Sequence, residues 1–175
     1  MTTLDPRTVR RMLASAAKAT TADGRGKKYE RLLEYVFSSV DGSLVVADER
    51  NYFGAEQVDL GVSNGGAFPG LPEQFLVECK NYAEPLDSKS VGYFLFICLS
   101  RGAELAIVAA ADGLTGNAAE STYAHSLALA ASANGCRLVV ITTADLLSLR
   151  SASDLVMMLR RRWLSAWANG GVGVG

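Results

Sequence analysis

The chain has 175 residues, of which 49% are hydrophobic and 20% are charged, and its formal net charge at pH 7 is −1. This length fits one domain with a single core, and the composition excludes a disordered or collagen-like chain. The three cysteines fit neither a zinc motif nor a disulfide framework, and no run of about 18 uncharged apolar residues predicts a membrane span.

Charge is distributed unevenly along the chain. Residues 1–31 hold eight basic and three acidic side chains, residues 150–175 hold four and one, and the middle holds five and fourteen. Basic ends around an acidic middle are typical of phosphate contacts beside an acidic metal site, and equally of solvated helix faces. Both interpretations stay open at this point.

The first part of the chain is expected to be helical. Apolar residues recur at helical spacing from Leu4 to Thr20, behind Asp5 as N-cap and Pro6 in the first turn. This helix either binds DNA or a partner, or packs on the core through its apolar stripe. Residues 21–27 are predicted as a linker because they hold two glycines, and a second helix is expected over 27–40.

The rest of the chain alternates strands and helices. Strands are expected at 43–48, 57–62, 75–80, 103–110 and 136–142, and helices at 88–101, 117–133, 143–149 and 153–167. The pattern predicts an α/β fold with a mixed central β-sheet flanked by helices on both faces. We expect an N-terminal helix and linker at 1–25, a core domain at 26–150, a C-terminal helix at 151–169 and a flexible tail at 170–175.

Two short strands carry charge where a strand core should be apolar. In Gln57–Val62, Asp59 points away from the face that holds the apolar residues, and in Phe75–Lys80 the side chains of Glu78 and Lys80 share one face. The interval between these strands is rich in glycine and proline, which predicts antiparallel neighbours. Asp59 should then lie beside Glu78 and Lys80, and two carboxylates with an ammonium group suit Mg²⁺-assisted phosphoryl chemistry.

Asp59 followed by Glu78-x-Lys80 at the end of an apolar strand resembles the PD-(D/E)-x-K signature of restriction-endonuclease-like nucleases. The resemblance is closest to the Mrr-like restriction endonuclease branch and extends from about Gly26 to Leu149. Two departures are visible: Val58 stands where proline is common, and Glu78 stands where Mrr-like members usually have glutamine. The resemblance implies a restriction-endonuclease-like core at 26–150.

The resemblance also implies roles for single residues. Asp59, Glu78 and the main-chain carbonyl of Cys79 would bind Mg²⁺, for which Mn²⁺ would substitute. Glu30, on the helix upstream, matches the extra acidic residue of many members and would be an accessory metal ligand. Lys80 would act on the attacking water or on the developing negative charge. The lone His125 excludes a multi-histidine zinc centre and is expected to be structural or exposed.

The function implied is a metal-dependent endonuclease that hydrolyses DNA phosphodiester bonds, with a role in defence against foreign DNA. Double-stranded DNA is the expected partner; a homodimer and a recognition or activator subunit are further partners that this interpretation allows. No membrane association is expected, and the default location is cytoplasmic. Apolar residues of the last helix could form core or a dimer surface: Met157, Met158, Trp163, Leu164 and Trp167.

Three alternatives stay open. The chain could be a non-catalytic module that binds nucleic acid or protein on a nuclease scaffold, since a fold alone does not determine activity. It could act on RNA instead of DNA. Asp59, Glu78 and Lys80 could also form a partly buried ion-pair network without chemistry.

Overall fold

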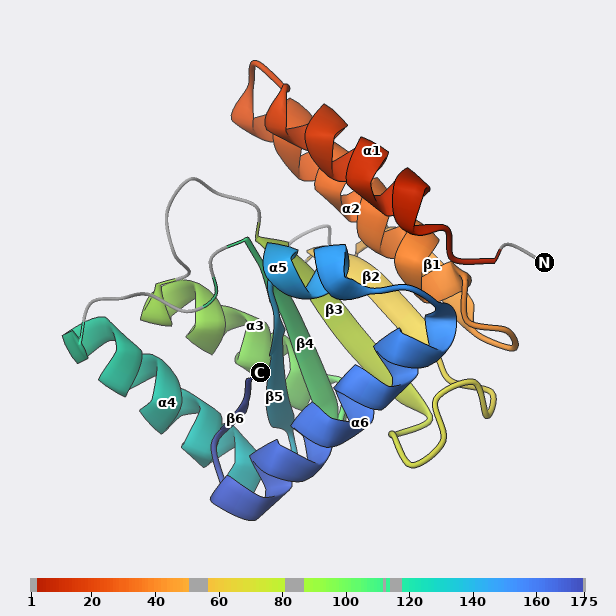
Figure 1. Cartoon of the computed structure of the whole chain (residues 1–175). Coiled ribbons are helices and arrows are strands. Elements are labelled where there is room, and N and C mark those ends of the chain that lie inside the picture. The colour runs from red at the N-terminus through yellow and green to blue at the C-terminus, as the bar shows by residue number, and fades with distance from the viewer. Residues whose placement is uncertain (1–2, 51–56, 81–86, 112, 114–117, 175) are drawn as a thin grey trace.

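A computed structural model describes residues 3–50, 57–80, 87–111, 113 and 118–174. The chain forms one six-stranded sheet between two layers of helices, with the strands in the spatial order β1-β2-β3-β4-β5-β6 (Figure 1). The strand bounds are β1 Leu44–Arg50, β2 Gln57–Ser63, β3 Gln74–Lys80, β4 Leu105–Ala110, β5 Arg137–Ile141 and β6 Val172–Gly173.

The sheet is mixed, as predicted. β1, β2 and β3 form an antiparallel meander, whereas β3, β4, β5 and β6 are parallel to one another. Parallel neighbours need a crossover, and helices supply it between successive strands. The α/β class and the mixed central sheet are therefore confirmed.

Helices cover both faces of the sheet. One face packs against α2 (Ala22–Ser38) and α6 (Ala152–Asn169); α1 (Pro6–Ala17) packs on α2, and α1 and α5 (Thr143–Ser148) contribute to the same apolar core. The other face packs against α3 (Ser88–Ser100) and α4 (Ala118–Ala133). This explains the almost continuous apolar sequence of β4: Leu105 and Ile107 point to the first layer, and Ala106 and Val108 point to the second.

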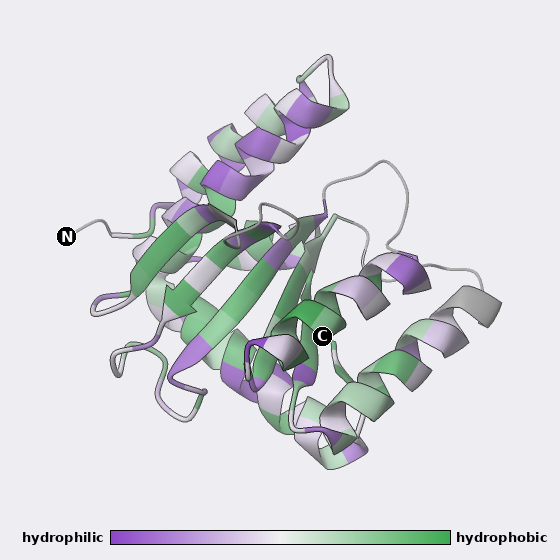
Figure 2. Ribbon diagram, turned by 180° about the vertical axis from the view of Figure 1, so that it is seen from behind, coloured by the Kyte–Doolittle hydropathy of each residue, from purple (hydrophilic) through white to green (hydrophobic). Residues whose placement is uncertain are grey.

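On the α3–α4 side, the helices leave the β1–β3 end of the sheet uncovered (Figure 2). Leu44 and Val46 of β1 are exposed there. In β2 and β3 the apolar side chains of Val58, Leu60 and Val77 are buried. Alternation along the strands turns the intervening side chains to the uncovered face.

Two expectations about the ends of the core are wrong. The predicted linker at 21–27 is helical, because Thr21 accepts a hydrogen bond from the Gly24 N–H and caps a helix that already begins at Ala22. The predicted flexible tail at 170–175 instead contributes β6, in which Val172 pairs with Leu138 of β5 and is buried. The last helix and the residues after it therefore belong to the same packed unit as the core.

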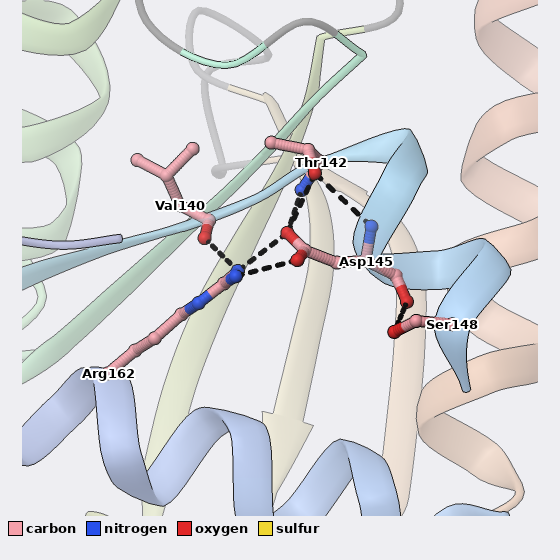
Figure 3. Close-up of polar contacts among 5 residues, drawn as sticks. All are labelled: Val140, Thr142, Asp145, Ser148 and Arg162. Atoms are coloured by element: carbon pink, nitrogen blue, oxygen red, sulfur yellow. Dashed lines mark hydrogen bonds and ion pairs between the residues drawn. The ribbon is translucent and has the colours of Figure 1, made fainter. Parts of the chain in front are cut away.

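A buried arginine connects α6 to the end of β5 (Figure 3). Arg162 donates to the Val140 carbonyl at 2.6 Å and to both carboxylate oxygens of Asp145 at 2.7 Å. Asp145 also accepts from the backbone N–H and the hydroxyl of Thr142, which completes the capping box of α5. Each group in this cluster has a partner, so its role is structural.

Candidate active site

The β2–β3 hairpin brings Asp59 to the Glu78-x-Lys80 segment. The antiparallel ladder runs from Ser63 opposite Gln74 to Leu60 opposite Val77. One residue further along, the Asp59 Oδ2 accepts the backbone N–H of Cys79 at 2.7 Å. The expected antiparallel pairing is therefore confirmed, and the Asp59 carboxylate is fixed against the backbone of β3.

Glu78 and Lys80 lie on one face of β3, as alternation predicts. The Lys80 Nζ is 2.6 Å from the Glu78 Oε1, and only 20% and 14% of the lysine and glutamate side chains are exposed. Hydrogen-bonded charge pairs of this length are strong, and shielding from water strengthens them further. The lysine side chain is thereby held beside the carboxylates.

The site carries more negative charge than its lysine neutralises. Burial and the nearby Asp59 raise the pKa of Glu78 to about 7, although Lys80 acts in the opposite direction. Burial likewise raises the pKa of Asp59, against the lowering effects of the Cys79 N–H and Lys80. Such repulsion among partly buried carboxylates favours binding of either a proton or a cation.

Glu30 of α2 joins this electrostatic cluster. Its side chain is half-buried, and its pKa is raised by burial first, then by the negative charges of Asp59 and Asp48. Tyr29, its neighbour on α2, is fully buried, so the packing of the helix fixes the position of Glu30. Glu34, one turn further along the same helix, is exposed.

Asp48 is an acidic residue of this region that sequence reasoning missed. Its neighbours in β1 pair with the neighbours of Asp59 in β2, Ala47 with Leu60 and Glu49 with Val58, which places Asp48 opposite Asp59. Asp48 also accepts a hydrogen bond from the Gln57 side chain at 2.7 Å. No motif points to Asp48; a β1–β2 register would have been needed to find it.

The Cys79 carbonyl faces the same gap as Asp59. In an antiparallel ladder the N–H and the C=O of one residue point to the same neighbouring strand. The Cys79 N–H points to β2, where Asp59 accepts it, so the carbonyl is directed to that side as well. The Cys79 thiol is buried among the apolar side chains beneath the sheet, and burial raises its pKa, so its side chain belongs to the core.

The described ranges contain no group of three or more His, Cys, Asp or Glu side chains that is arranged to hold a metal ion by itself. His125 is exposed on α4. Within the same ranges, no helix is both long and apolar enough to cross a bilayer. In the described part of the chain, Asp59, Glu78 and Lys80 are the strongest candidates for chemistry, because these charged side chains lie close together and are mostly shielded from water.

Comparison of the chain with protein-family models and with curated proteins finds no match.

Proposed function

We propose that the protein is a Mg²⁺-dependent endonuclease that hydrolyses DNA phosphodiester bonds at the β2–β3 junction. The observation that carries this proposal is the arrangement of Asp59 at the Cys79 backbone, beside the paired Glu78 and Lys80. Two carboxylates and an ammonium group on adjacent strands form a combination that phosphodiester hydrolysis can use.

The donor set suits Mg²⁺ better than zinc. Mg²⁺ binds oxygen, retains several waters and commonly takes only one or two carboxylates together with substrate phosphate, so a closed three-ligand cage is not needed. Asp59, Glu78 and the Cys79 carbonyl supply hard oxygen donors, and the pKa of Glu78 is raised first by burial and then by the negative charge of Asp59. When bound, the ion would polarise the phosphoryl oxygen and lower the pKa of a coordinated water.

The side chains have distinct roles in this proposal. Asp59 and Glu78 hold the cation. Lys80 orients the attacking water or stabilises the charge that develops on the phosphate oxygens. Glu30 acts from α2 as an accessory carboxylate, reaching the cation directly or through water.

The order of elements supports a restriction-endonuclease-like core. A helix with Glu30, β1, β2 with Asp59, β3 with Glu78-x-Lys80, then helix, strand, helix and strand is the order that the Mrr-like resemblance implies. The Asp59 carboxylate and the Cys79 carbonyl also face one gap, as shared ligation would require.

The short Glu78–Lys80 contact also favours a second candidate, a non-catalytic module in which these residues only stabilise the sheet. Such a network pairs Lys80 with Glu78, while Asp59 and Glu30 add further negative charge close to this pair. The nuclease proposal accounts for this remaining negative charge, and the structural alternative does not. We therefore favour the nuclease.

The test is cleavage of supercoiled plasmid by the purified protein with Mg²⁺ or Mn²⁺, and with EDTA. We expect metal-dependent nicking or linearisation that falls by about 100-fold or more in Asp59→Asn and in Lys80→Met. Glu30→Gln should reduce the rate by about tenfold, the range seen when supporting residues of a metal site are removed. A structured RNA offered in parallel decides between DNA and RNA as substrate.

Glu34→Gln is the matched control, because Glu34 lies on the same helix as Glu30 and is exposed. It should cleave like the wild type. Cleavage that persists unchanged in Asp59→Asn would contradict the proposed site. If calorimetry shows Mn²⁺ binding that Asp59→Asn abolishes, but neither DNA nor RNA is cut, the metal site stands and the nuclease activity is rejected.

A further inference from the structure

Helices α3 and α4 expose apolar side chains on the side that faces away from the sheet. In Figure 2 green hydrophobic segments alternate with pale or hydrophilic ones along both helices. Five exposed apolar residues of the two helices, here called the α3–α4 apolar face, are Tyr93, Phe96, Leu99, Tyr123 and Leu127.

Part of this face lies where the two helices meet. A Cβ atom placed on Gly92 of α3 would lie 3.2 Å from the Leu127 Cδ1 of α4, so the helices approach closely at this glycine. Phe96 lies one turn after Gly92, and Tyr123 lies one turn before Leu127. Residues four apart lie on the same side of a helix, so Phe96 and Tyr123 lie on the sides of their helices that meet at this close approach.

We propose that the α3–α4 apolar face is the interface of a homodimer. In a two-fold dimer the same patch meets itself, so the patch must be self-complementary. Lys89, in the first turn, is the single Asp, Glu, Lys or Arg residue of α3, and the described side chains of α4, residues 121–133, include none. Lys89 lies one turn before Tyr93, at the start of α3, so the rest of the face carries no formal charge and meets a second copy of itself with little repulsion between like charges.

The exposed stripe of α6 fits a second copy less well. Met157, Leu164 and Trp167 are exposed there, but Arg160 and Arg161 lie between them on the same helix and are exposed too. A two-fold axis through this stripe would place four arginines close together, which opposes self-association. We therefore place the dimer interface on the α3–α4 apolar face and not on the α6 residues that the sequence offered as core or dimer surface.

The exposed aromatic side chains supply a large part of the area that a dimer interface needs. Tyr93, Phe96 and Tyr123 are 53%, 59% and 62% exposed. With roughly 200 Å² for a whole aromatic side chain, these three alone would bury about 350 Å² per copy. Standard interfaces bury about 800 Å² per partner, so the aromatics supply nearly half, and the two leucines and the neighbouring small residues extend the contact. Aromatic residues at the centre of such a patch are the ones that contribute most to affinity.

Analytical ultracentrifugation of the full chain over a concentration series tests this proposal. The wild type should reach a dimer, and Phe96→Asp should weaken the association by about 30-fold or more, the effect of losing a central aromatic residue. Leu164→Asp is the matched control, because Leu164 is as exposed as Phe96 but lies on α6; this variant should dimerise like the wild type. Circular dichroism and thermal unfolding verify that each variant is folded.

If Phe96→Asp does not fold, Tyr123→Asp on α4 applies the same test from the neighbouring helix. A wild type that stays monomeric throughout the series would overturn the proposal. Equal association of the wild type and Phe96→Asp would also overturn it, as would loss of the dimer in Leu164→Asp. The proposal does not depend on nuclease activity, so its failure leaves the β2–β3 site untouched.

Discussion

Asp48 lies directly opposite Asp59 across the β1–β2 ladder, between the Ala47–Leu60 and Glu49–Val58 pairs. Like charges opposite one another destabilise a sheet. Asp48 also adopts a φ of 58°, a left-handed backbone conformation that Asp and Asn tolerate better than other residues with a side chain. We propose that a cation bound beside these two carboxylates would offset their repulsion.

Replacing Asp48 by asparagine tests this explanation. Asparagine keeps the left-handed conformation and the hydrogen bond with Gln57, but it removes the charge that raises the pKa values of Glu30 and Asp59. We expect Mn²⁺ affinity, measured by calorimetry, to fall by about tenfold, as for other supporting residues of metal sites. Asp41→Asn, at an exposed turn before β1, serves as the control and should bind metal like the wild type. Unchanged affinity in Asp48→Asn would exclude Asp48 from the site.

The stability of the metal-free protein should decrease as the pH rises toward neutrality. The pKa of Glu78 is about 7 in the folded protein because of burial and the nearby Asp59, and about 4.3 in an unfolded chain. A carboxyl group whose pKa is raised by folding binds its proton more tightly in the native state. Its contribution to stability is therefore complete below about pH 4.3 and is lost as the pH rises through about 7, a decrease on the order of 1–3 kcal/mol.

Urea denaturation in EDTA between about pH 5 and pH 8 measures this decrease. Glu78→Gln should remove most of it, whereas Glu104→Gln, at an exposed carboxyl just before β4, should leave it unchanged. Added Mg²⁺ should restore stability at the upper end of this range if the proposed cation site exists. A free energy of unfolding that rises with pH across this interval would contradict the environment described for Glu78.

Several features of the fold could be predicted from local patterns. The apolar runs of β4 and β5 predicted strands covered on both faces, and the turn residues at 63–74 predicted the antiparallel β2–β3 pair. The start of α2 was missed because Gly24 and Gly26 favoured the prediction of a linker, although Thr21 caps the helix. β6 was missed because a strand of two residues is too short to show alternation of apolar and polar side chains. This strand is defined by its pairing with β5.

The candidate site was only partly predictable, because some of its residues come together through packing between separate elements. Alternation along single strands correctly placed Glu78 and Lys80 on one face, and the turn placed Asp59 beside them. The electrostatic interaction of Glu30 with Asp59 depends on how α2 packs on the sheet, and the place of Asp48 depends on the β1–β2 register. Neither relationship can be predicted from the periodicity of a single helix or strand.

The β6 strand depends on the absence of a side chain at Gly173. A Cβ atom at this position would collide with the backbone carbonyl of Arg162 in α6, which cannot move as a flexible side chain could. Gly173→Ala should therefore displace β6 and lower the free energy of unfolding by about 1–3 kcal/mol, as overpacking does elsewhere. Gly171→Ala, where the nearest atom is the Asn169 side-chain oxygen at 3.4 Å, should cost much less. Equal stability of the two variants, measured by urea denaturation, would show that β6 does not pack against α6 as described.

Asp145 and Asp154 offer a controlled comparison of the buried ion pair. Both occupy the third position of a capping box, at the start of α5 and of α6, but Asp145 alone also binds the buried Arg162. Asp145→Asn leaves the guanidinium without its counter-charge and should lower the free energy of unfolding by about 2–4 kcal/mol at pH 7. Asp154→Asn should cost clearly less, because it removes a capping interaction alone.

The effect of Asp145→Asn should also depend on pH. Burial raises the pKa of Asp145, but hydrogen bonds from Arg162 and Thr142 outweigh it, so the pKa lies below the usual value. A carboxyl group with a lowered pKa stabilises the fold above its unfolded pKa of about 3.9 and loses this contribution as the pH falls further. The difference between wild type and Asp145→Asn, measured by urea denaturation, should therefore be constant near neutral pH and shrink below about pH 4. A difference that persists in acid would show that the substitution disturbs packing, and that the charge of Asp145 contributes little.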